Sequence, residues 1–227
     1  MFSIVIPSKN PKNLVPCVES LLYREPDLSP TKIVVVDDGL GEEVKTHLPE
    51  EITWVTGVSP FIFARNVNLG IKAAKEDSIL ILNDDTLLET PGGFSLLAQE
   101  SKQHPEFGVI SSSTDSAGVH QFPRGVTGIR EAERVVSFVC VFIPRSVINL
   151  VGLLDERFTE YGWDDNDYCH RVTLAGLKLG VADCCFVNHT TLNSSFRGGP
   201  NKPGDIRPGA KIYHEKYPDD EVSKAFL

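Results

Sequence analysis

Residues 32–39 read KIVVVDDG, and this stretch decides the fold. It holds four apolar β-branched residues in succession, Ile33 to Val36, which favour a strand that is buried on both faces. The strand should end at Asp37-Asp38-Gly39, because Asp and Gly open turns. Similar apolar runs occupy residues 2–6, 52–55 and 78–82, and amphipathic segments lie between them at residues 13–23 and 62–75. Buried strands that alternate with helices predict an α/β protein with a mostly parallel central sheet flanked by helices.

The second half of the sequence is less regular. It predicts strands at residues 108–111, 134–143, 178–182 and 185–188, and helices at residues 94–104 and 164–175. Residues 112–130 have no periodicity and predict a long loop, and residues 193–209, rich in Gly, Pro and Ser, predict a mobile flap. We find no internal repeat and no linker, so one domain is expected over residues 1–227.

Composition narrows the class of protein. The 227 residues include 31 Asp and Glu against 22 Lys and Arg, a formal net charge of -9. No block of Lys and Arg is present that could grip nucleic-acid phosphates by charge alone. No apolar run approaches the roughly 20 residues that span a bilayer, and the first residues have no basic region typical of a signal peptide. Five cysteines without CxxC spacing indicate neither a disulfide framework nor a zinc knuckle. A cytoplasmic protein is expected.

The acidic residues are concentrated in a few places. Asp37, Asp38, Asp84 and Asp85 contribute -4, and residues 155–167 hold six acids and one base, or -5. These two contributions add up to the whole net charge of -9, so the rest of the chain is neutral. An anionic partner such as DNA therefore stays open.

Polar clusters follow three of the predicted strands, at Pro7-Ser8, Asp37-Asp38 and Asn83-Asp84-Asp85. Ligands of open α/β sheets bind at the carboxyl ends of the strands. Carboxylate and amide oxygens suit Mg²⁺ or Mn²⁺, which can neutralise a diphosphate leaving group. The alternative is that Asp and Asn only end strands and open turns.

Two further segments hold candidate residues. Asp164 is placed to cap the helix predicted from residue 164, with Asp167 in its first turn. Asp165 is not needed for the cap and is a candidate general base. On the helix at residues 62–75, one polar face carries Arg65, Asn68 and Lys72, and this face either meets solvent or contacts phosphates.

Other α/β enzymes require motifs that this sequence does not have. Neither GxGxxG nor GxxxxGK[ST] is present. Residues 83–87 approach the DxDxT of haloacid-type phosphatases, but Asn83 stands at the nucleophile position and cannot form an aspartyl-phosphate. The Gly/Arg-rich loop of a sugar nucleotidyltransferase is also missing after the first strand.

Four stretches taken in order resemble the glycosyltransferases of family 2. They are FSIVIPS at residues 2–8, IVVVDDG at 33–39, ARNVNLG at 64–70 leading to ILNDDT at 81–86, and WDDND at 163–167 with His189 downstream. The similarity covers about residues 1–195. It implies the GT-A fold, which has a Rossmann-like sheet flanked by helices and a small acceptor-side subregion.

The resemblance also implies roles for single residues. The nucleotide-binding residues would be Pro7, Ser8, Asp37, Asp38, Arg65, Asn68, Lys72, Asn83 and Asp84. Residues 83–85 resemble the DxD motif, with Asp85 and His189 as ligands of Mn²⁺ or Mg²⁺. Asp164 and Asp165 resemble the Glu-Asp pair that holds the catalytic base, taken here as Asp165. Asn83 and Asp164 depart from the residue types usual at their positions, and the second departure leaves open which of the two acids is the base.

The expected function is that of an inverting, metal-dependent glycosyltransferase. The expected donor is a nucleoside-diphosphate sugar, with UDP as the expected nucleotide. The acceptor would be a carbohydrate or another hydroxyl-bearing molecule, a modified nucleobase in DNA included. Within the single domain, about residues 1–110 would bind the nucleotide sugar, about 111–195 would serve the acceptor and catalysis, and 196–227 would be a flexible tail. The alternative is a non-catalytic nucleotide-sugar-binding or scaffolding protein with a decayed site.

Overall fold

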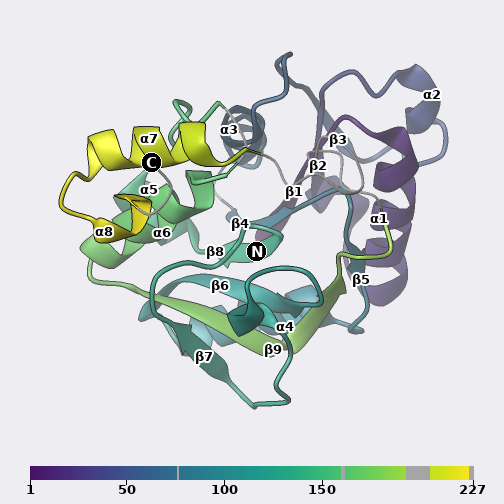
Figure 1. The fold of residues 1–227 in the computed structure, drawn as a ribbon. Coiled ribbons are helices and arrows are strands. Elements are labelled where there is room, and N and C mark those ends of the chain that lie inside the picture. Colours follow the sequence, from purple (N-terminus) through teal and green to yellow (C-terminus); the bar gives the residue numbers. More distant parts are fainter. Residues whose placement is uncertain (76, 160–161, 193–204, 225–227) are drawn as a thin grey trace.

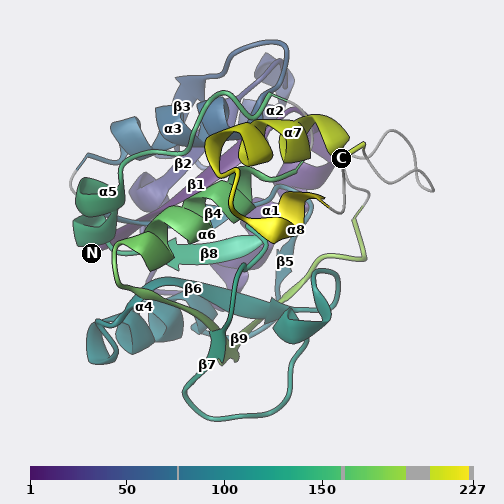
Figure 2. The same ribbon diagram turned by 60° about the vertical axis from the view of Figure 1, so that its left-hand side comes forward.

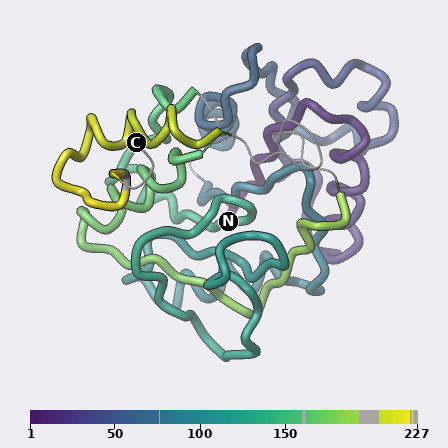
Figure 3. Tube along the Cα trace, in the orientation of Figure 1, coloured from purple at the N-terminus to yellow at the C-terminus, as the bar shows by residue number. Residues whose placement is uncertain are grey.

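The computed structural model describes residues 1–75, 77–159, 162–192 and 205–224. Within these residues the centre is a nine-stranded sheet in the order β3-β2-β1-β4-β8-β6-β9-β5, with β7 paired to β9 beside this path. Helices cover the sheet (Figure 1). In the view of Figure 3, most of the purple first part of the chain lies on the right and the yellow C-terminal part on the left.

The first half of the sheet is parallel, as its sequence predicts. β1 (Phe2–Ser8) pairs with β2 (Ile33–Asp37) and with β4 (Ser78–Leu82), and β2 pairs with β3 (Thr53–Thr56). Successive side chains of β1 point to opposite faces. Ile4 and Ile6 therefore belong to the core that contains side chains of α1 (Pro11–Arg24), and Val5 to the core that contains those of α3 (Phe63–Ala73). The register sets Ser8 opposite Asp37, so the ends of β1 and β2 are level.

The second half of the sheet is mixed. β8 (Cys140–Ile143) runs antiparallel to both β4 and β6 (Phe107–Thr114). β9 (Lys178–Asn188) runs parallel to β6 and antiparallel to β5 (Leu87–Leu88) and β7 (Ile129–Ala132). β9 replaces the two strands predicted at 178–182 and 185–188, because its pairing with β6 resumes after a register shift at Ser112/Ser113. The end of β9 is thereby carried to the same edge as the end of β4.

Residues 112–130 are more ordered than the long loop that their sequence predicts. β6 continues to Thr114, a 3₁₀ turn η2 occupies Val119–Gln121, and β7 begins at Ile129. The carboxylate of Asp183 accepts backbone N–H groups of Arg124 at 2.7 Å and of Val126 at 3.1 Å. A side chain from β9 thus accepts two backbone N–H groups of this segment, and no local sequence pattern predicts such a contact.

The strand predicted at residues 134–143 is shorter in the structure. Only Cys140–Ile143 pairs within the sheet. Before it, the side chain of Gln121 accepts the N–H of Ser137 at 2.8 Å and donates to the carbonyl oxygen of Ser137 at 3.2 Å. A glutamine side chain therefore takes the place of a neighbouring strand at this residue.

The remaining helical elements connect the strands or pack on the sheet. They are η1 (Pro30–Lys32), α2 (Glu42–Lys45), α4 (Gly93–Gln103), α5 (Arg145–Val151), α6 (Asp164–Leu174), α7 (Arg207–Lys216) and α8 (Glu221–Lys224). Among the residues that the structure describes, no helix has the length and apolar character needed to cross a membrane.

The last two helices lie in the segment expected to be a flexible tail. α7 lies beside α6 (Figure 2). Ala210 and Tyr213 of α7 are buried with Phe158 and Trp163, which precede α6. Part of the expected tail is therefore built into the domain. Residues 193–204, which make up most of the predicted flap, lie outside the described residues.

A buried glutamate at the end of α1 caps α4. Glu25 Oε1 accepts the N–H groups of Phe94 at 2.5 Å and Ser95 at 3.2 Å, and Oε2 accepts the Ser95 hydroxyl at 2.8 Å. The residue at the N-cap itself, Gly92, has no side chain to do so. Glu25 thus satisfies the first N–H groups of a helix that begins far along the chain, at Gly93.

Replacing Glu25 with alanine should destabilise the fold. The buried N–H groups at the start of α4 would lose their acceptor, which costs about 1–3 kcal/mol. Glu25→Gln keeps an acceptor oxygen and should lose less. Urea unfolding of both variants measures the two costs, and an Ala variant as stable as the wild type would contradict the capping role.

Candidate active site

The three polar clusters predicted at strand ends lie together in the structure. Ser8 Oγ donates a 2.6 Å hydrogen bond to Asp84 Oδ2, and the Ser8 carbonyl oxygen accepts the N–H of Asp38 at 2.9 Å. Asp37 Oδ1 accepts a backbone N–H three residues further along at 2.7 Å, which shapes the turn after β2. Pro7 is buried within β1. The ends of β1, β2 and β4 therefore form one polar edge.

Two buried oxygens at this edge have no hydrogen-bond partner among the described residues. They are Oδ1 of Asn83 and Oδ1 of Asp84. Burial, and after it the charge of Asp85, raises the pKa of Asp84 to about 7, although the hydrogen bond from Ser8 acts in the opposite direction. An unsatisfied buried polar atom costs about 1–3 kcal/mol. A cation or polar ligand bound here would offset that cost.

Asp85 and His189 are 104 positions apart and meet at the same edge. His189 Nε2 lies 3.0 Å from Asp85 Oδ1, and His189 Nδ1 lies 2.9 Å from the carbonyl oxygen of Ser116. Because a carbonyl oxygen only accepts, we assign the hydrogen of the neutral imidazole to Nδ1. Nε2 then turns a lone pair toward a carboxylate. Two acceptors this close require a proton or a metal ion between them.

The donor set fits a divalent cation that is completed by a ligand. An imidazole nitrogen and a carboxylate oxygen converge, and the buried Oδ1 atoms of Asn83 and Asp84 lie on the neighbouring residues. In the part of the chain that the structure describes, no three His, Cys, Asp or Glu residues are grouped to hold a metal ion. A cation bound by Asp85 and His189 would therefore take its further ligands from substrate and water.

A cavity of about 590 Å³ opens at this edge. Its lining includes Asn83 and His189, which follow β4 and β9, and Asp164 and Asp165, which begin α6. Aromatic side chains complete the lining, namely Phe61, Phe63, Phe138 and Trp163. The size and the mixture of apolar walls with a few convergent polar groups are those of a small-molecule site.

The acidic pair lies at the start of α6. Burial and the neighbouring charge of Asp165 raise the pKa of Asp164, and burial raises the pKa of Asp165 to about 6. Asp165 Oδ1 accepts the N–H of Asn166 at 2.8 Å, and the Phe138 backbone also hydrogen-bonds to its carboxylate. A carboxylate with a pKa nearer to neutrality is a stronger base than a solvent-exposed one.

The N-cap of α6 differs from the prediction. Asp164 is the first helical residue, and Trp163 occupies the cap position with a left-handed φ of 74°. A non-glycine residue in this region costs about 1–3 kcal/mol and is held there by its surroundings. The strained residue directly precedes the two candidate catalytic acids.

Sequence reasoning missed part of the cavity wall. Lys9 follows β1 and lies over the ring of Phe61, with its Nζ 5.3 Å from the ring centroid. Both residues line the cavity. The only signal in the sequence was that Lys9 stands beside Ser8, since the aromatic residues before α3 have no distinctive spacing.

The polar face of α3 does not line the cavity. Arg65 Nε lies 3.5 Å from Glu156 Oε2, and Lys72 is exposed. Asn68 is buried, donates to the Leu154 carbonyl oxygen at 2.9 Å and to Glu156 Oε1 at 3.0 Å, and accepts the Leu154 N–H at 3.0 Å. Both amide hydrogens and the amide oxygen of Asn68 are thus bonded to the loop before α6. Helical spacing shows that Arg65, Asn68 and Lys72 share a face, but it does not show which segment that face meets. The nucleotide contact of Asn68 stays a prediction.

Replacing Asn68 with alanine should lower stability and leave nucleotide affinity unchanged. The buried backbone groups of Leu154 would lose their partners, a cost of about 1–3 kcal/mol. Thermal unfolding measures the first effect, and calorimetric titration with a nucleotide measures the second. A variant of normal stability that binds nucleotide more weakly would instead support the predicted nucleotide contact of Asn68.

Comparison with known proteins identifies the family. Residues 3–126, more than half of the chain, match the family described as glycosyl transferase family 2. The chain belongs to this family. The crystal structure of GalNAc-T7 with UDP, GalNAc and Mn²⁺ has the same fold, with a TM-score of 0.76 at 14% sequence identity. The match covers 99% of this chain and 49% of GalNAc-T7, so the chain spans about half of that protein's length. No protein of curated function matches the chain.

The family 2 match ends before three of the candidate residues. Asp164, Asp165 and His189 lie beyond residue 126. The shared fold extends over nearly the whole chain and includes them. The predicted α/β class and GT-A fold are therefore confirmed, and the closure of the second half onto the strand ends brings these residues to the cavity.

Proposed function

We propose that this chain is an inverting, metal-dependent glycosyltransferase that moves a sugar from a nucleoside-diphosphate sugar to an acceptor hydroxyl. One observation carries the proposal: Asp164, Asp165 and His189 line one cavity in a chain of glycosyl transferase family 2, and His189 contacts Asp85. UDP is the proposed nucleotide, and the GalNAc-T7 structure with UDP and Mn²⁺ on the same fold supports this choice.

Asp165 is the proposed general base. Its carboxylate takes the proton of the acceptor hydroxyl, and the acceptor oxygen forms a bond to the anomeric carbon from the face opposite the diphosphate. The bond between that carbon and the β-phosphate oxygen breaks, and its electrons leave with the diphosphate. The configuration at the anomeric carbon is therefore inverted. Asp164 and Asp165 titrate as a pair whose pKa is raised, first by burial and then by the charge of the neighbouring carboxylate.

Asp85 and His189 are the proposed ligands of Mn²⁺ or Mg²⁺. When bound, such an ion supplies positive charge that stabilises the departing diphosphate. The polar edge formed by Pro7, Ser8 and Asp37 is the proposed site of the nucleoside. We further propose that about residues 1–110 bind the donor and about residues 111–195 serve the acceptor, which is a carbohydrate or another molecule with a hydroxyl group.

A thermal-shift panel tests the donor. UDP-, GDP-, CDP- and dTDP-sugars are added with Mn²⁺, with Mg²⁺ or with EDTA. A ligand present at 100 times its Kd stabilises the folded state by about 2.7 kcal/mol. Stabilisation by a UDP-sugar that depends on the metal is expected, and no stabilisation by any nucleotide sugar would contradict the proposal.

Turnover of the donor distinguishes the enzyme from a non-catalytic nucleotide-sugar-binding protein. Slow release of UDP from the bound UDP-sugar, with water as the acceptor, is expected of the enzyme. A chain that binds the donor and releases no UDP, alone or with any acceptor, is a binding protein instead.

A further inference from the structure

The C-terminal helix α7 is docked on the turn that begins α6. A Cβ added to Gly209 of α7 would lie 2.5 Å from the Gly162 carbonyl oxygen and 3.0 Å from Trp163 Cδ1, so the two backbones are in close contact. The rings of Trp163 and Tyr213 are 5.0 Å apart between centroids. This contact covers the strained residue that precedes the acidic pair.

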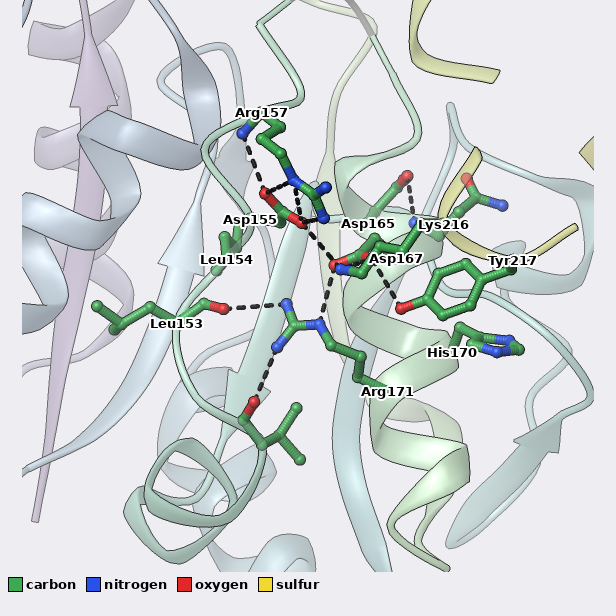
Figure 4. A network of polar contacts seen from close by, with 12 residues as sticks. Leu153, Leu154, Asp155, Arg157, Asp165, Asp167, His170, Arg171, Lys216 and Tyr217 are labelled. Atoms are coloured by element: carbon green, nitrogen blue, oxygen red, sulfur yellow. Dashed lines mark hydrogen bonds and ion pairs between the residues drawn. The ribbon is translucent and has the colours of Figure 1, made fainter. Parts of the chain in front are cut away.

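An ionic network extends the contact (Figure 4). Lys216, the last residue of α7, donates to Asp167 Oδ1 at 2.5 Å and to Asp155 Oδ2 at 2.8 Å. The Tyr217 hydroxyl donates to Asp167 Oδ1 at 3.0 Å, and Arg171 Nε donates to Asp167 Oδ2 at 2.9 Å. Asp167 is fully buried in the first turn of α6, so its charge depends on these donors.

We propose that Lys216 is a positioning residue for catalysis, which holds the first turn of α6, and with it Asp164 and Asp165, in place at the cavity and balances the charge of Asp167 behind them. This inference rests on the proposed function, because it assigns Lys216 a role in that same reaction. Lys216 does not line the cavity, and it acts through Asp167.

Loss of the Lys216 charge should change the pKa of the acidic pair in one direction, upward. The negative charges of Asp165 and Asp167 both raise the pKa of Asp164, after burial. Removing the ammonium of Lys216 leaves Asp167 less compensated, so the acidic pair holds a proton up to a higher pH. A base must be deprotonated to act, and the acidic limb of the rate profile therefore moves to higher pH.

The other charged groups around Asp167 stay in place in such a variant. Arg171 is fixed by the carbonyl oxygens of Val151 and Leu153, both at 2.9 Å. Arg157 pairs with Asp155 at 2.6 Å, and the His170 ring packs on Tyr217 at 4.2 Å. Lys9 and His189 line the cavity itself. A shift of the acidic limb of the pH–rate profile therefore measures the loss of the Lys216 charge alone.

The test compares Lys216→Met with Lys211→Met, which alters an exposed lysine of the same helix. UDP release from the UDP-sugar selected in the thermal-shift panel is measured from pH 4.5 to 9. For Lys216→Met we expect kcat to fall about 10-fold or more, since small displacements of catalytic groups can cost 100-fold. The donor KM should stay within about twofold, and the acidic limb should move up by about half a pH unit or more, as expected when a nearby charge is lost. Lys216→Arg keeps the positive charge, so its acidic limb should lie at the same pH as that of the wild type.

If Lys216→Met does not fold, Tyr217→Phe still tests the proposal. It removes one hydrogen bond to Asp167 and should move the limb in the same direction by less. The proposal is overturned if Lys216→Met has the same kcat and the same acidic limb as Lys211→Met. A lower melting temperature would then show only that Lys216 supports the fold. Asp165→Asn in the same assay keeps the two questions apart: if it turns over normally, the base assignment fails, whatever Lys216 does.

Discussion

Replacing Asp165 with asparagine is expected to lower the rate of sugar transfer about 10²–10⁴-fold, the usual contribution of a general base. Asparagine has nearly the same shape and accepts a hydrogen bond from the backbone of residue 166 as Asp165 does. The donor should therefore bind with unchanged affinity. Steady-state kinetics of UDP release and calorimetry of donor binding measure the two quantities separately.

The same substitution should not destabilise the protein. Burial raises the pKa of Asp165 to about 6, above the ordinary value near 4. A carboxyl group whose pKa is higher in the folded state adds stability below that pKa and removes it as the pH rises through it. At pH 7.5 a neutral asparagine should thus leave the melting temperature equal or higher. A large loss of stability would mean that the lost activity reports misfolding.

The wild-type rate should also depend on pH in a particular way. Burial raises the pKa of Asp165 above the ordinary value, which is about 4. The acidic limb of kcat/KM should therefore lie clearly above the range of an exposed carboxyl group. A limb near pH 4 would show that the base is exposed to solvent during turnover.

Replacing Asp85 with alanine is expected to remove the metal dependence of donor binding. Loss of a residue that only supports a metal ligand typically costs 10–100-fold in metal affinity, so loss of a ligand should cost about 100-fold or more. His189→Ala should act in the same direction, because His189 Nε2 converges with Asp85 Oδ1 at 3.0 Å. Calorimetric titration of Mn²⁺ in the presence of UDP measures the effect.

Glu106→Gln serves as the matched control for the metal site. Glu106 is an exposed acid that does not line the cavity, and its loss should leave Mn²⁺ binding unchanged. Undiminished Mn²⁺-dependent binding in Asp85→Ala would remove Asp85 from the metal site. If Mn²⁺ binding is lost in Asp85→Ala but kept in His189→Ala, Asp85 is a metal ligand and His189 only forms a hydrogen bond.

The parallel half of the fold is readable from the sequence because its signals are local. Four β-branched residues from Ile33 to Val36 can hardly be anything but a buried strand, and the structure has β2 there. The strand-end rule then gathers Ser8, Asp37 and Asp84 at one edge without knowledge of any contact. Both inferences need only the order of residues along the chain.

The rest of the site depends on contacts between distant segments. Asn68 bonds to Leu154, 86 positions away, and Glu25 caps a helix that starts with Gly93. Lys216 reaches Asp167 across 49 positions. Each is a polar side chain that satisfies a buried group elsewhere, and neither periodicity nor composition encodes its partner. The resemblance to family 2 supplied His189, which the residues alone would have left as a structural histidine.

The stereochemistry of the first product tests the central claim most directly. The protein is incubated with Mn²⁺ and the α-linked UDP-hexose selected in the thermal-shift panel, and proton NMR records the anomeric signal before the free sugar equilibrates. Attack opposite the diphosphate, with Asp165 as base, predicts that the β-anomer appears first. Initial release of the α-anomer would contradict the account, because the configuration would then be retained.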